Sequence, residues 1–167
     1  MARQSVSALF DILERERKCC AALIEVGKEE QRSLVENDLD ELNMRTKEMQ
    51  KAVSELSKLH RERKQQLDRL AEELGLDPER ITIQEIINEL RDESARALKT
   101  KVQELLTTGE TLYRVNRQTI YLINFSLGLV DKQISNLADV LSEAEGYGED
   151  GKSLPGKSRP KIVEGKV

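Results

Sequence analysis

The sequence lacks the residues that usually build compact sheets and tight turns. It has no tryptophan, aromatic residues make up only 3% of its 167 positions, and proline occurs three times. Charged residues, in contrast, reach 35%. This composition favours long, solvated α-helices over a compact sheet, and the length is typical of a single domain. We therefore expect an all-α fold.

The sequence also lacks a basic surplus and a long apolar run. Its formal net charge is −4 and its pI is about 5.3, whereas nucleic-acid binding draws most of its affinity from clustered lysine and arginine. No apolar run approaches the roughly 20 residues that cross a bilayer, and no signal-peptide core follows the first residues. We expect a cytoplasmic protein that has no nucleic-acid partner.

The residue types needed for catalysis and metal binding are equally scarce. His60 is the single histidine, and the two cysteines, Cys19 and Cys20, are adjacent in the chain. Their side chains would diverge by about 100° on a helix, which argues against a disulfide, and they lack the spacing of a metal site. Phosphate loops and nucleophile elbows are missing as well. We expect no enzyme activity, no metal or other cofactor and no small-molecule substrate, with Cys20 in the core and Cys19 on its flank.

What the sequence does contain is apolar residues at alternating steps of three and four, the heptad pattern of helices packed as coiled coils. The pattern predicts long helices over about residues 5 to 35, 38 to 74 and 93 to 144. We expect an elongated antiparallel bundle of these three helices. In the second helix the predicted seam comprises Leu42, Thr46, Met49, Val53, Leu56, His60, Arg63, Leu67, Leu70 and Leu74.

Two polar seam positions need an explanation. Glu16 interrupts the seam of the first helix, and it either marks a hydrated layer or pairs with a basic residue on a facing helix. His60 lies on the second seam near Arg63, where a polar layer that fixes helix register is a better interpretation than a general base.

Turn and capping signals separate the helices. Asn37 and Asp38 predict a short turn, and Gly75 ends the second helix. Thr82 and Glu85 form a capping box that starts a short helix over residues 83 to 90. Asp92 predicts a break near residues 91 to 93, although the sequence leaves open whether the short helix joins the third long one.

The composition changes after Glu145. The last 22 residues hold five of the nine glycines and two of the three prolines. We expect a helical domain over residues 1–145 and a flexible tail over residues 146–167.

The segment from Tyr113 to Val130 is too apolar for one seam. One stripe runs through Asn116, Thr119, Ile123 and Val130, and a second through Gln118, Leu122, Phe125 and Leu129. Either both stripes are buried at the centre of a four-helix arrangement, or the second one forms a surface that binds an amphipathic helix of another protein. For Phe125 and Leu129 we favour the surface.

The stretch from Leu105 to Ile134 resembles the long C-terminal helix of the FlgN family of flagellar export chaperones. The similarity lies in an Asn, a Leu-Ile pair and a Ser-Leu pair at the family's spacing, and the shared positions include Asn116, Ile123, Ser126 and Leu127. The turn at Asn37-Asp38-Leu39, the Glu-Leu-Gly-Leu end of the second helix and the segment Tyr147 to Gly151 also fit the family's layout. Thr119 departs from it, because the family often has a second Asn there.

The resemblance implies a cytoplasmic chaperone that binds the C-terminal helices of hook-associated proteins, which form the hook-filament junction. It would prevent their premature assembly and deliver them to the type III export gate. The implied partners are these clients and export gate or export ATPase components, and we expect a monomer or weak dimer. We expect the client-binding residues to be Gln118, Tyr121, Leu122, Phe125 and Leu129. The alternative is a cytosolic coiled-coil scaffold, a homo-oligomer without an export client.

Overall fold

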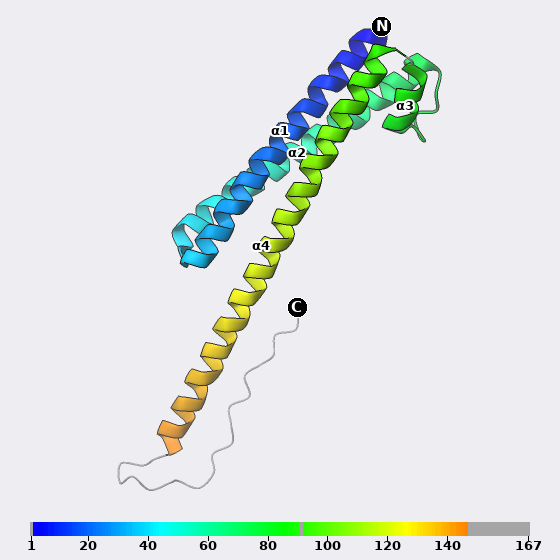
Figure 1. The fold of residues 1–167 in the computed structure, drawn as a ribbon. Helices are drawn as coiled ribbons and strands as arrows, with labels where there is room; N and C mark the ends of the chain where they lie inside the picture. Colours follow the sequence, from blue (N-terminus) through cyan, green and yellow to red (C-terminus); the bar gives the residue numbers. More distant parts are fainter. Residues whose placement is uncertain (1, 91, 147–167) are drawn as a thin grey trace. The chain divides into compact units, whose positions relative to one another are not determined.

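A computed structural model describes the backbone of residues 2–90 and 92–146 and the side chains of residues 4–90 and 92–139. These residues form four helices and no strand (Figure 1): α1 (Ala2–Glu36), α2 (Leu39–Leu74), α3 (Ile83–Leu90) and α4 (Glu93–Gly146). The all-α fold is confirmed, and each boundary lies within three residues of the expected one. The predicted tail lies outside the described residues except for Gly146. The chain divides into two units, residues 1–123 and 124–167, which are described separately.

Local hydrogen bonds explain where the helices begin and end. Asp38 caps α2 by accepting a bond from the backbone N–H of Glu41, and Gly75 ends α2 in the left-handed conformation at φ 70°. The capping box at α3 is confirmed, since Thr82 and Glu85 exchange hydrogen bonds of 2.8 and 3.2 Å. Asp92 accepts a bond of 3.0 Å from the Ser94 N–H at the start of α4. The short helix is therefore a separate element from α4.

In the first unit the long helices run up, down and up. α1 and α2 are antiparallel, as shown by the Arg15 to Glu62 ion pair near the middle of α1 and the Thr46 to Glu30 hydrogen bond near its end. α4 is parallel to α1 in the first unit. Lys101 contacts Glu14 in the N-terminal half of α1, and Val115, further along α4, contacts Gln31 near the C-terminal end of α1. α2 is thus antiparallel to α1 and to the first-unit part of α4.

The densest core lies near the N-terminus of α1, where all four helices meet (Figure 1). Leu9, Leu70, Ile86 and Leu98, one from each helix, have no exposed surface there. The core cluster consists of Val6, Leu9, Leu13, Leu70, Ile86, Ile87 and Leu98. No residue from Tyr113 to Ile123 belongs to this cluster, so the first-unit part of that segment does not lie at the centre of the four-helix core, although Val115 and Thr119 are buried elsewhere.

Burial follows the heptad spacing in most of α1 but only in part in α2. In α1 the seam residues from Val6 to Gly27 are buried, and Cys20 lies in the core with Cys19 on its flank, both as free thiols. In α2, Leu70 is buried as predicted, whereas Val53 is 48% exposed and His60 is exposed. The buried residues Leu59 and Gln66 belong to a different row. Gln66 faces α1, since its side-chain amide donates a hydrogen bond of 2.9 Å to the Ser5 carbonyl, so the row of α2 that packs on α1 is rotated from the predicted seam.

Glu16 pairs with a basic residue on the facing helix, which decides between the two alternatives for this position. Its carboxylate is 3.1 Å from a guanidinium nitrogen of Arg63, and the Glu16 residue is 2% exposed. Burial raises the pKa of Glu16, and the positive charge of Arg63 opposes that rise. A second guanidinium nitrogen of Arg63 lies 2.8 Å from the His60 ring. The polar layer is therefore formed by Glu16 and Arg63, with His60 on its exposed side.

Candidate helix-binding surface

The middle of α4 is a continuous helix without charge for more than three turns. No proline falls within α4, and no charged residue lies between Arg117 and Asp131. Elsewhere the chain is rich in charge, so this stretch differs from an ordinary solvated helix. Of the fifteen exposed large apolar side chains among the described residues, seven lie in this stretch and eleven lie on α4. Exposed apolar side chains concentrated on one helix indicate an interaction surface.

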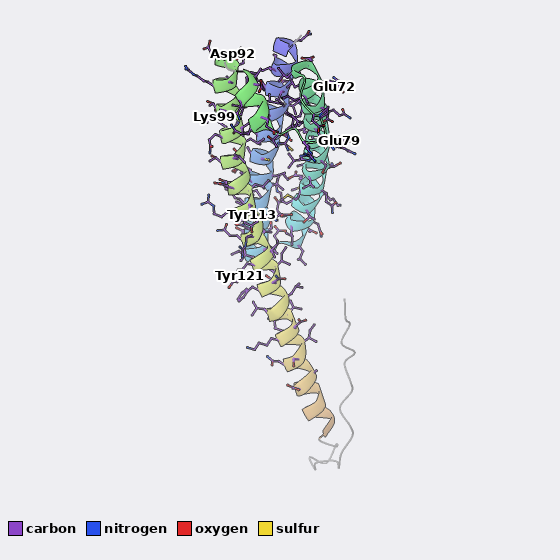
Figure 2. All side chains as sticks on the ribbon, turned by 90° about the vertical axis from the view of Figure 1, so that its right-hand side faces the viewer. Glu72, Glu79, Asp92, Lys99, Tyr113 and Tyr121 are labelled. Atoms are coloured by element: carbon purple, nitrogen blue, oxygen red, sulfur yellow. The ribbon has the colours of Figure 1, made fainter. Side chains whose placement is uncertain are left out.

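The five predicted client-binding residues lie on one face of α4. On a helix they span an arc of about 100°. Tyr121 is 69% exposed and points away from the neighbouring helices (Figure 2), while Phe125 and Leu129 are 56% and 48% exposed. Gln118 is also exposed, and Leu122 is half-buried. Gln118, Tyr121 and Leu122 belong to the first unit, and Phe125 and Leu129 to the second.

The first-unit part of this set borders a shallow groove between α1 and α4. The groove has a volume of about 620 Å³. The Arg117 guanidinium lies 6.0 Å from the ring centre of Tyr113, close enough for a cation–π interaction. The lining residues are Gln31, Tyr113, Arg114, Arg117, Gln118, Tyr121 and Leu122. Sequence reasoning did not include Gln31 or the two arginines, because only the tertiary structure brings α1 beside this part of α4.

Thr119, which departs from the family pattern, makes a polar contact with α1. The amide of Gln31 donates hydrogen bonds to the Val115 carbonyl at 2.9 Å and to the Thr119 hydroxyl at 3.1 Å. The Thr119 hydroxyl in turn donates to the Val115 carbonyl at 3.1 Å. Thr119 is therefore buried, and its hydroxyl takes part in the hydrogen bonds that connect α1 to α4.

The expectation that the first stripe would be buried holds only for Thr119. Asn116 is exposed, and Ile123 and Val130 are 40% and 49% exposed. Gln31, the contact of Thr119, lies near the C-terminal end of α1, so α1 covers little of the first unit beyond that point. Neither predicted stripe included Ile120 or Leu127, although Leu127 is one of the family-pattern positions. With them the exposed residues form an unbroken heptad row: Ile120, Ile123, Leu127, Val130, Ile134 and Leu137.

Two other kinds of site are not found in the described part of the chain. Over residues 2–90 and 92–146, no helix is both long and apolar enough to span a membrane. The same residues contain no group of three or more His, Cys, Asp or Glu side chains that could hold a metal ion.

Residues 1–155 match the FlgN protein family. The chain belongs to the FlgN family. No curated protein and no solved structure matches it. Membership in FlgN, a family of chaperones and not of enzymes, assigns this chain a general role in flagellar export. Among its family-pattern positions, Asn116, Ile123 and Leu127 are exposed and Ser126 is half-buried.

Proposed function

We propose that this FlgN-family protein binds the C-terminal helices of hook-associated proteins in the cytoplasm, prevents their premature assembly and delivers them to the type III export gate. The client would pack on α4 against Gln118, Tyr121, Leu122, Phe125 and Leu129. The observation that supports this proposal most directly is the exposure of Tyr121, Phe125 and Leu129 on one face of a helix in a flagellar export chaperone. Contact with export gate or export ATPase components belongs to the same proposal.

The chemistry of the surface fits an amphipathic helix. Such a helix binds through apolar residues spaced three and four positions apart, and the α4 face offers apolar residues at the same spacing. The uncharged stretch between Arg117 and Asp131 would leave no charge buried without a partner. The client's own apolar face would be covered, which would keep it from pairing with other subunits before export.

The test is to truncate one anchor and measure folding and binding separately. Phe125→Ala should weaken binding of a purified C-terminal fragment of a hook-associated protein by about 2 kcal/mol or more, because a few aromatic and aliphatic anchors dominate such interfaces. Its thermal unfolding should change little, since the ring is 56% exposed. Leu129→Ala should behave in the same way.

A matched control is Val35→Ala, which removes a 74% exposed apolar side chain from the end of α1. It should leave both binding and unfolding unchanged. If the Phe125 and Leu129 variants unfold early yet bind normally, the two side chains support the fold and the proposed surface is wrong. Normal behaviour of both variants in both assays would place the client site elsewhere on the chain.

A further inference from the structure

A second groove lies between α2 and α4 in the first unit, with α1 as its floor. It has a volume of about 350 Å³. Leu23 and Gly27 of α1 line it, as does Tyr113, which Figure 2 shows on α4. The walls are formed by Met49, Val53 and Leu56 of α2 and by Gly109, Leu112, Val115, Asn116 and Thr119 of α4.

Two glycines create this groove. A Cβ atom on Gly27 would lie only 2.8 Å from Cγ1 of Val115, so the missing side chain lets α4 pack closely on α1. A Cβ atom on Gly109, in contrast, would meet nothing within 4 Å. Space therefore remains between α4 and α2 at the level of Gly109, while the opposite side of α4 is closed against α1.

The two walls present rows of residues at helical seam spacing. Met49, Val53 and Leu56 are part of the heptad seam of α2, but Val53 remains 48% exposed and the other two are half-buried. Across the groove, Gly109, Leu112 and Asn116 of α4 also follow steps of three and four residues. Two seams that face one gap without filling it offer holes on both sides for the apolar residues of another helix.

The charge pattern of the lining restricts what can occupy the groove. None of its eleven lining residues is charged, although charged residues make up 35% of the chain. A charged or strongly polar face would lose its hydration there without gaining a partner. The groove therefore suits the apolar face of an amphipathic helix. Its size fits a few inserted side chains, with the remainder of that helix lying above α2 and α4.

We propose that this groove binds a helix of the export client, which inserts apolar side chains between α2 and α4 and becomes a fourth helix of the first unit. The inference rests on the proposed function and extends it, because α1 and α2 then take part in client recognition together with α4. Tyr113 lines both this groove and the α1–α4 groove that contains Gln118, Tyr121 and Leu122, so the two binding regions adjoin on α4.

Gly109 allows a test that does not damage the fold. Gly109→Leu places a large side chain in the groove. Gly109→Ala also removes the glycine but leaves the groove almost unfilled. Both substitutions should raise the unfolding temperature, because glycine is a poor residue in a helix interior and this position has open space. We expect Gly109→Leu to weaken binding of the hook-associated C-terminal fragment about tenfold or more, and Gly109→Ala to change it less than about twofold.

A second pair of variants approaches the groove from α2. Val53→Glu puts a carboxylate in the α2 wall, and Met44→Glu puts one on a 45% exposed apolar position of the same helix that does not line the groove. Val53→Glu should lose binding by about tenfold or more, and Met44→Glu should bind like the wild type.

The outcomes separate this inference from the proposed function. If Gly109→Leu and Val53→Glu bind normally while Phe125→Ala does not, the groove inference is wrong and the α4 surface stands. If the wild type binds no fragment at all, both are wrong. If light scattering shows a wild-type dimer that Gly109→Leu converts to a monomer, the groove holds a second copy of the chain and the client assignment is overturned.

Discussion

At the scale of single residues, the Glu16 to Arg63 pair decides how α1 and α2 fit together at the polar layer. A carboxylate that is 2% exposed is costly unless it has a counter-charge, and Arg63 supplies one at 3.1 Å. Oε2 of Glu16 has no hydrogen-bond partner among the described residues, so the two groups attract each other as charges without a well-directed bond. This pair stabilises the fold less than its short distance suggests. Removal of one partner, however, should strongly destabilise the folded state, because the other charge would remain buried.

We therefore predict that Arg63→Met lowers the free energy of unfolding by about 3 kcal/mol at neutral pH, because it leaves Glu16 charged and buried. The deficit should shrink toward about pH 5. Burial raises the folded-state pKa of Glu16 above its ordinary value of 4.5, and the loss of Arg63 would raise it further. A group of this kind favours the folded state at low pH and ceases to do so as the pH rises through its folded pKa.

Urea denaturation at about pH 7.5 and about pH 5 would measure this effect. The double variant Glu16→Gln/Arg63→Met should recover most of the lost stability at both pH values, since no buried charge remains. An equal deficit of Arg63→Met at both pH values would show that lost packing of the arginine stem, and not the charge on Glu16, causes the destabilisation.

At the scale of helices, the close contact between Gly27 and Val115 sets the distance between α1 and α4. Gln31 reinforces it one turn later through its hydrogen bonds to Val115 and Thr119. The same contact helps to shape the α2–α4 groove, because it holds α4 against α1 and away from Met49 and Val53. Close packing of α4 on α1 therefore requires a glycine at position 27.

We predict that Gly27→Ala destabilises the protein by about 1 kcal/mol. The added Cβ would overlap with Val115, and overpacking of this kind costs about 1 to 3 kcal/mol, from which the better helix propensity of alanine recovers up to about 1 kcal/mol. In a Val115→Ala background the overlap disappears, so the same substitution should become stabilising.

Chemical denaturation of the wild type, the two single variants and the double variant would complete this cycle. The sign reversal is the decisive result. If Gly27→Ala has the same effect in both backgrounds, Val115 does not limit the approach of α4 to α1.

At the scale of the whole molecule, the exposed heptad row of α4 supports two different assemblies. The six residues from Ile120 to Leu137 have the spacing of a coiled-coil interface, which can bind a client helix or a further copy of the chain. In a coiled-coil scaffold, a further copy of the chain would cover this row permanently. In an export chaperone, the row would stay available to a client helix.

We predict that the protein alone is a monomer or weak dimer of its 19.0 kDa chain and gains mass when the hook-associated fragment is added. Light scattering over a range of protein concentrations would measure this. A stable oligomer whose mass is independent of concentration and unchanged by the fragment would favour the scaffold.

The positions of the helices could be predicted from the sequence because they depend on local interactions. Asp38, Gly75 and the Thr82 to Glu85 capping box act within a few residues of themselves, and each ends or begins a helix where expected. The exposure of Phe125 and Leu129 was also predicted correctly, because the apolar residues of that stretch exceed what one seam can bury. Ile123 and Val130 were expected to be buried but are exposed, and for Ile123 the reason is that α1 ends close to the level of Thr119.

The sequence by itself therefore determined the helical fold, the helix boundaries, the FlgN family and the apolar, uncharged character of α4 around Phe125. The tertiary structure alone decided which rows of each helix are buried. A heptad pattern shows that a row is apolar, but not which neighbour covers it. That choice depends on the lengths of the helices and on contacts between residues far apart in the chain, such as Gly27 with Val115 and Glu16 with Arg63. These contacts leave the α2–α4 groove open, because no helix of the first unit covers the apolar faces of α2 and α4 that line it.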